Sequence, residues 1–314
     1  IDDAERPSTI EEPKYWYGPH SKMVNGRVPI IWVPKLSEST SEIGTILTKL
    51  LAMKSITLTP EQHRYAVDQI VKYPTALYLR LATRVVSRWT SFGEYLGTLP
   101  PSVSSLIDAI YAELERVYGP KLCSYALAFL TFSKLGVSST EMEDLLSIVN
   151  EVLLEVFQYS DPKTGRLPSH VLRRLLNDLE GLVAQGENGV FTWYHRQLRE
   201  AAERRYVYLR LEAHKIMAVY FNDFELPNVD KYGNRKDRRL QDMSLLFTKT
   251  RVWFDGARVN RRRCLEGIHQ CLEAKMFEEA VLLLCSIESV FAHLRVKEGF
   301  SLVDYLIQLQ EKSK

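Results

Sequence analysis

Apolar residues recur at helical spacing over most of the chain. In the first stripe, Ile43, Ile46 and Leu50 stand three or four residues apart, a spacing that places side chains on one face of a helix. Three similar stripes follow and are separated by proline-marked breaks, over residues 60–73, 74–86 and 103–118. Consecutive helices with short connections predict a small helical bundle.

One helix start carries a full set of signals. Thr59 can cap the helix, Pro60 occupies its first position, and Gln62 stands three residues after the cap, as in a capping box. We expect this helix to stop near Tyr73, where Pro74 opens the next one.

The middle of the chain has a different pattern. A helix over residues 122–134 is apolar on most sides, so we expect it at the centre of a domain. A second helix starts at Ser138 or Ser139, and a third starts near Pro168. A turn over residues 185–189 and the run 190–194 then predict a β-hairpin. Three helices followed by a hairpin is the order of a winged helix.

The two ends of the chain predict different structures. The β-branched run 28–33, closed by a proline, predicts a buried strand whose neighbours lie upstream. Near the other end, helical patterns over 195–221 and 241–310 flank a polar loop with a turn at Gly233. The second stretch is typical of paired antiparallel helices in a solenoid-like arm. The fold class is therefore mainly α.

Composition and charge exclude several classes of protein. The 314 residues include 41 lysines and arginines against 39 aspartates and glutamates, a net charge of +2, which gives no overall attraction to nucleic acid or anionic lipid. No apolar run approaches the ~18 residues of a membrane span. The start at Ile1 without a signal-like segment indicates an internal portion of a longer cytoplasmic protein.

Cysteine and histidine supply no evident reactive centre. The four cysteines lack the spacing of metal ligands and are expected to be buried thiols in a reducing compartment: Cys123, Cys264, Cys271 and Cys285. The sequence contains no Gly-x-x-x-x-Gly-Lys-Ser/Thr phosphate loop, no dinucleotide fingerprint and no His-Glu-x-x-His. We therefore assign no catalytic residue and no metal ligand.

Two basic clusters have alternative interpretations. One occupies residues 235–239, and the other contains Arg258, Arg261, Arg262 and Arg263. They are either solvated faces and helix-end charges or a surface for nucleic acid or an acidic partner. The predicted third helix also carries two arginines, but Asp178 and Glu180 nearby would repel phosphate. Nucleic-acid binding is therefore disfavoured.

Three segments of the central block, 125–146, 172–179 and 191–206, resemble a known family. They look like the winged-helix region of NACHT-type STAND ATPases, in the branch of nephrocystin-3, the telomerase-associated vault protein and the NACHT–WD40 proteins. The resemblance is strongest over residues 121–207 and fades towards both ends.

The resemblance implies four parts. They are the edge of a nucleotide-binding core at 1–40, a first helical domain at 41–120, a winged helix at 121–208, and a second helical domain or helical-repeat arm at 209–314.

The resemblance also implies two nucleotide contacts. Pro74 falls where the family has a proline that packs on adenine, although any helix can begin with proline. His195 matches a winged-helix histidine that reaches the β-phosphate of ADP, a task that suits a ring N–H donor. The spacing from Phe191 departs from the family pattern, with Trp193 as the alternative aromatic residue. The competing interpretation is a histidine that caps a helix or packs after the hairpin.

Three functions compete at this stage. The first is the regulatory and scaffolding part of a signalling ATPase whose lid closes on ADP. The second is a nucleotide-free structural scaffold in a cytoskeletal or ciliary assembly, and the third is a winged-helix nucleic-acid binder. ATP or ADP with magnesium is expected only together with an upstream phosphate loop, so the chain alone is no enzyme, while the parent protein would be a slow regulatory ATPase. The expected partners are other domains of the same large protein and further proteins, without a membrane.

Overall fold

The computed structural model describes residues 39–90, 98–158, 166–186, 189–222, 253–255 and 258–312. The chain forms two compact units that divide between Gly97 and Thr98. Three predicted features lie outside the described residues: the strand at 28–33, the basic cluster at 235–239 and the turn at Gly233.

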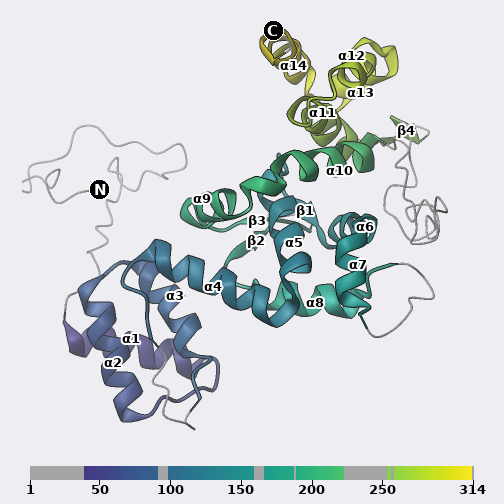
Figure 1. Cartoon of the computed structure of the whole chain (residues 1–314). Coiled ribbons are helices and arrows are strands. Elements are labelled where there is room, and N and C mark those ends of the chain that lie inside the picture. The colour runs from purple at the N-terminus through teal and green to yellow at the C-terminus, as the bar shows by residue number, and fades with distance from the viewer. Residues whose placement is uncertain are drawn as a thin grey trace, which may run out of the picture. The chain divides into compact units, whose positions relative to one another are not determined.

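The first unit contains three helices that pack on one another, α1 (Thr40–Ala52), α2 (Pro60–Lys72) and α3 (Ala76–Val86) (Figure 1). Each helix was predicted from its apolar stripe. Their buried faces form a shared core that includes Ile43, Leu47, Ile70, Tyr78 and Leu81.

The starts of α2 and α3 show one prediction confirmed and one wrong. The Thr59 hydroxyl accepts the Gln62 N–H at 3.2 Å, and the Gln62 side chain accepts the Thr59 N–H at 3.1 Å, which is the predicted capping box. Pro74 does not open α3, because Thr75 is its N-cap and accepts the Tyr78 N–H at 3.2 Å. A threonine oxygen satisfies a free N–H at a helix start, which proline cannot do.

The second unit begins with α4 (Val103–Tyr118), which packs on α5 (Pro120–Phe132), α8 (Ser169–Asp178) and α9 (Arg196–Arg205). The apolar pattern grouped this helix with the three before it. Its contacts place it in the second unit, and the functional domain boundaries stay a prediction.

Helix α5 is the centre of the second unit, as predicted. Every residue from Leu122 to Phe132 is buried, because the helix contacts α4, α6 (Ser139–Ile148), α7 (Asn150–Val156), α9 and α10 (Arg210–Asn222). Its amino terminus is capped from a distance, since the Glu155 carboxylate accepts the N–H groups of Lys121 and Leu122 at 3.1 and 2.8 Å.

A small antiparallel sheet joins the helices of this unit. Its strands are β1 (Val137–Ser138), β2 (Val183–Gln185) and β3 (Val190–Trp193), in the spatial order β1-β3-β2. The β2–β3 pair is the predicted hairpin and aligns Val183 with Trp193. Before β1, Gly136 has φ +91°, and a Cβ there would lie 2.1 Å from the Phe191 carbonyl oxygen. Only glycine fits this close approach.

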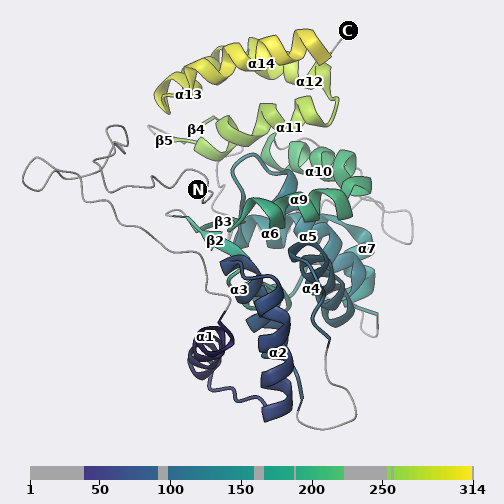
Figure 2. The same cartoon turned by 90° about the vertical axis from the view of Figure 1, so that its left-hand side faces the viewer.

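The last part of the chain is a helical arm above α10 (Figure 2). It contains a short strand pair, β4 (Phe254–Asp255) and β5 (Arg258–Val259), then a π-helical turn η3 (Arg263–Gly267), α11 (Ile268–Glu273), α12 (Phe277–Cys285), α13 (Ile287–Arg295) and α14 (Gly299–Lys312). The prediction of helix from residue 241 onwards is wrong at β4 and β5. The helix starts only after Asn260, whose side chain accepts the Arg263 N–H at 3.0 Å.

The mainly α fold class is confirmed. The described residues contain helices α1 to α14 and two small antiparallel sheets. No helix in this part of the chain is long and apolar enough to cross a bilayer.

Candidate functional site

His195 lies in the turn between β3 and α9. It is the N-cap of α9, and its Nδ1 accepts the Gln197 N–H at 3.2 Å, so the capping geometry proposed as the competing interpretation is present. Because Nδ1 acts as an acceptor, the neutral ring carries its proton on Nε2. In the described part of the chain, Nε2 has no hydrogen-bond partner, and the ring is half-buried.

The strand before His195 is anchored to the core of the unit. The Trp193 indole N–H donates to the Thr131 hydroxyl at 3.1 Å, and its ring centroid lies 5.7 Å from that of Tyr111. Tyr111 is fully buried and donates to the Leu198 carbonyl at 2.8 Å. His195 is therefore held between a fixed strand and a fixed helix, at the helix end where the dipole favours an anion.

Pro74 lies in the first unit, in the connection between α2 and α3, and is half-buried. The ring of the preceding Tyr73 is exposed and lies 5.4 Å from that of Tyr78. Burial raises the pKa of the Tyr78 phenol to about 12, so it stays neutral. Pro74 and His195 are thus in different compact units, and the adenine and phosphate contacts both stay predictions.

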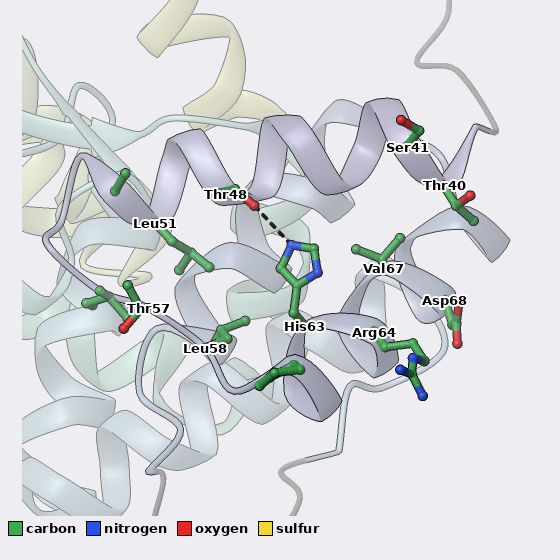
Figure 3. Close-up of a pocket in the computed structure, with 13 residues that line it drawn as sticks. Thr40, Ser41, Thr48, Leu51, Thr57, Leu58, His63, Arg64, Val67 and Asp68 are labelled. Carbon is green, nitrogen blue, oxygen red and sulfur yellow. Dashed lines mark hydrogen bonds between the residues drawn. The ribbon is translucent and has the colours of Figure 1, made fainter.

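A cleft of about 750 Å³ opens between α1 and α2 in the first unit (Figure 3). The Thr48 hydroxyl gives its single proton to the Gly44 carbonyl at 2.8 Å. His63 Nε2, at 3.0 Å from Thr48 Oγ1, must therefore be the donor of their hydrogen bond. The remaining walls are mostly aliphatic, including Leu51 and Val67. This cleft was not predictable from the sequence, because its lining comes from both helices and the turn between them.

Arg262 and Arg263 of the second basic cluster have partners inside the second unit. The Arg262 guanidinium donates to the Glu141 carboxylate at 2.7 Å and to the Gly136 carbonyl at 2.8 Å. The Arg263 guanidinium lies 4.4 Å from the centroid of the Trp253 ring. Both side chains contribute to the fold through contacts that a solvated face would not make.

The Glu266 side chain lies close to Arg262 and has no exposed surface. Its carboxylate accepts the N–H groups of Lys134 and Leu135 at 3.1 and 2.9 Å and the Gln270 amide at 2.8 Å. Burial outweighs these contacts and raises the pKa of the carboxyl. The side chain joins the turn after α5 to the helical arm.

His214 extends this network, and the His269 ring lies beside that of His214. The Gln270 amide nitrogen donates to Glu266, so its oxygen accepts from His214 Nδ1 at 2.6 Å. Burial lowers the pKa of His214 and lowers that of His269 to about 4. Both rings are neutral at physiological pH; His214 is buried and His269 is half-buried.

Three of the four thiols are buried. Cys123, Cys264 and Cys271 are buried, as expected, whereas Cys285 is exposed. Burial raises the pKa of Cys264 and Cys271 to about 12, which keeps them protonated. Within the described ranges, no three His, Cys, Asp or Glu residues are grouped to hold a metal ion.

Comparison with known proteins identifies relatives of the chain. No family model matches it, and no solved structure matches it. It is 31% identical over 173 residues to NACHT and WD repeat domain-containing protein 2 of Homo sapiens, which covers 52% of this chain and 10% of that protein. It is 28% identical over 262 residues to NACHT domain- and WD repeat-containing protein 1 of Mus musculus, which covers 77% of this chain and 16% of that protein.

The chain is a homologue of NACHT and WD repeat proteins. The resemblance to the NACHT–WD40 branch, drawn from the central helices and the hairpin, is confirmed. The matches span only a tenth to a sixth of the relatives' own length, so what the whole protein does is a matter for proposal.

Proposed function

We propose that this chain is the regulatory and scaffolding portion of a larger NACHT-type ATPase, in which a winged helix closes on bound ADP. The observation that carries the proposal is the His195 ring, whose Nδ1 is occupied by the helix cap while Nε2–H is left to donate. The similarity to NACHT and WD repeat proteins supports the same assignment.

The order of elements around α5 supports the winged-helix part of the proposal. The chain runs through α5, β1, α6, α8, β2 and β3, with α7 inserted before α8, and the sheet order β1-β3-β2 places the first strand beside the hairpin. This is the order that a winged helix requires. His195 follows the last strand directly, where movement of the unit would carry its ring towards or away from a nucleotide.

His195 is suited to an anionic oxygen in two ways. The cap sets the tautomer, so the ring presents a donor without first having to be protonated. The amino terminus of α9 adds its positive dipole end at the same place. We propose that Nε2–H donates to the β-phosphate of ADP. An adenine contact by Pro74 is a separate proposal that comes from the family resemblance. The lid would then be a two-state element that the bound nucleotide biases.

Binding of ATP or ADP requires a motif that this sequence does not contain. A phosphate loop would bind ATP or ADP with magnesium, and no such motif is present in these 314 residues. The lid and the arm would therefore act on a site built elsewhere in the larger protein. The other domains of that protein are the first partners proposed for this chain.

The test separates the lid role of His195 from its capping role. Asparagine is a good N-cap but cannot reach as far as Nε2, so His195→Asn should keep α9 stable and lose the phosphate contact. His195→Ala should lose both. We expect ADP released from the denatured whole protein to fall roughly tenfold in both variants, since a hydrogen bond to a charged group contributes about 1.5 to 3 kcal/mol.

Melting temperature is the control measurement. It should stay unchanged for His195→Asn and fall for His195→Ala. Full ADP content in His195→Asn would contradict the proposal and leave His195 as a helix cap only. Absence of nucleotide from the wild-type protein as well would favour the nucleotide-free scaffold.

A further inference from the structure

Helix α13 carries large apolar side chains on the face that is turned away from the arm. One face packs into the arm, where Ala292 and His293 are buried. The other face points to solvent and carries Ile287, Phe291 and Leu294, which are 72%, 60% and 58% exposed. In a surface helix the apolar stripe normally faces the core, so an apolar stripe on the outward face indicates a partner.

The neighbouring helix carries further exposed apolar side chains. Helix α14 packs beside α13 (Figure 2), and its buried Tyr305 faces the arm. Its outward side carries four exposed apolar residues, Phe300, Val303, Leu306 and Ile307. We call the exposed apolar residues of α13 and α14 together the outer face of the arm.

The size of the outer face exceeds that of an ordinary surface patch. Weighted by their exposed fractions, its side chains offer on the order of 800 Å², if a fully exposed large apolar side chain offers roughly 150 to 200 Å². Monomeric proteins rarely expose contiguous apolar patches above about 300 to 600 Å². About 800 Å² on each partner is the size of a stable protein interface.

The spacing on the outer face defines what can cover it. Ile287, Val290, Phe291 and Leu294 stand at i, i+3, i+4 and i+7, the pattern through which one helix packs along another. A helix is therefore the element that fits. The charges beside the stripe then decide the direction of that helix.

Two exposed charges flank the α13 stripe on one side. Glu288 and Arg295 are seven residues apart, two helical turns or about 10 Å along the axis. An antiparallel copy brings the charged flanks of both helices together and puts Glu288 near Arg295 of the second copy at both ends. A parallel copy places the two charged flanks on opposite sides of the pair and forms neither ion pair. A two-fold arrangement repeats every contact in this way.

We propose that the outer face binds the outer face of a second copy of this chain, with the two α13 helices antiparallel. This interface does not depend on the nucleotide contact proposed for His195. It would give the arm a scaffolding role of its own, because pairing through α13 and α14 leaves the hairpin and α9 outside the interface.

Sedimentation equilibrium of the purified chain tests the proposal. The wild type should be a dimer, and Phe291→Glu should weaken dimerisation roughly thirtyfold or more, as for a central interface residue. Leu211→Glu changes an exposed apolar residue on α10 and is the matched control that should leave the dimer intact. Circular dichroism should show equal helix content for all three proteins.

Charge exchange tests the antiparallel register. Glu288→Arg and Arg295→Glu should each weaken the dimer, and the double variant should restore it, because the pair is then reversed but still complementary. Three results would each overturn the proposal: a wild-type chain that is monomeric at roughly 100 μM, a dimer that is insensitive to Phe291→Glu, or a double variant that dimerises no better than the single variants. A dissociation constant of about 100 μM corresponds to a binding free energy of about 5 kcal/mol, which is weaker than that of a stable interface.

Discussion

Replacing Glu266 by alanine removes an acceptor from the inside of the second unit. Three donors then lose the carboxylate: the N–H groups of Lys134 and Leu135, and the amide of Gln270, which keeps only its longer bond to the Phe132 carbonyl at 3.4 Å. The Gln270 bond is buried and the two backbone bonds are part-buried; a buried donor left unsatisfied costs about 1 to 3 kcal/mol, and a part-buried donor costs less. The variant also no longer buries a carboxylate, a cost that the raised pKa of Glu266 reflects, and this offsets part of the loss. We expect a net destabilisation of about 3 kcal/mol.

Urea unfolding followed by tryptophan fluorescence measures this loss as a change in the free energy of unfolding. Glu311→Ala on α14 is the matched control, because that glutamate is exposed and its loss should stay within about 0.5 kcal/mol. A loss below about 1 kcal/mol for Glu266→Ala would refute the reasoning, since orphaned buried donors could not then be expensive at this site.

The Glu266→Ala variant also tests whether Arg262 and Glu266 stabilise the fold together. Arg262 Nη1 lies 3.7 Å from the Glu266 carboxylate and its Nε lies 2.7 Å from Glu141. Arg262→Ala and Glu266→Ala should therefore be non-additive by about 0.5 to 3 kcal/mol. Additive losses would mean that the two side chains stabilise the arm independently.

Three further predictions concern the core, a turn and pH. Leu130→Asp buries an unpaired charge in α5 and should destabilise the second unit by more than about 4 kcal/mol; a soluble variant with unchanged melting by circular dichroism would contradict the placement of this helix. Gly136→Ala should lower the free energy of unfolding in urea by more than about 2 kcal/mol, because Gly136 has a positive φ and its added Cβ would meet the Phe191 carbonyl. Gly189→Ala is the control, with φ +70° and its nearest neighbour at 3.6 Å, and should lower it by about half as much. Equal losses would exclude the steric argument. Burial lowers the pKa of His269 to about 4, so between pH 6.5 and 4 the unfolded chain binds a proton that the folded chain does not. The free energy of unfolding should therefore fall by up to about 3 kcal/mol as pH falls through this window. His269→Gln should flatten this pH dependence, and an unchanged profile would show that His269 is not its source.

Features encoded within a few residues were predictable from the sequence. Thr59 and Gln62 sit three residues apart, so the capping box that starts α2 could be predicted directly. Helix α5 is apolar on nearly every side, which marks a central position whatever surrounds it. The β2–β3 hairpin was predicted from a glycine-containing turn between two short apolar runs.

Features that depend on distant partners were not predictable. Arg262 and Glu141 are 121 residues apart, so nothing near either residue marks the pair. Helix α7 starts at Asn150 after Val149, which provides no side-chain cap, and was missed for that reason. The place of α4 in the second unit depends on its packing against α5 and α9, to which its own apolar stripe gives no clue.

The candidate site was predictable in residue identity but not in chemistry. A histidine directly after a hairpin and before a helix predicts either a ligand contact or a cap. The structure shows the cap, and through it assigns the tautomer. The direction of the remaining donor follows only from that hydrogen bond.

The most direct test of the account is a structure of the whole protein determined by cryo-electron microscopy with ADP present. The account predicts His195 Nε2 at hydrogen-bond distance, about 2.7 to 3.2 Å, from a β-phosphate oxygen, with Nδ1 still accepting the Gln197 N–H. Bound ADP with His195 turned away from its phosphates would contradict it.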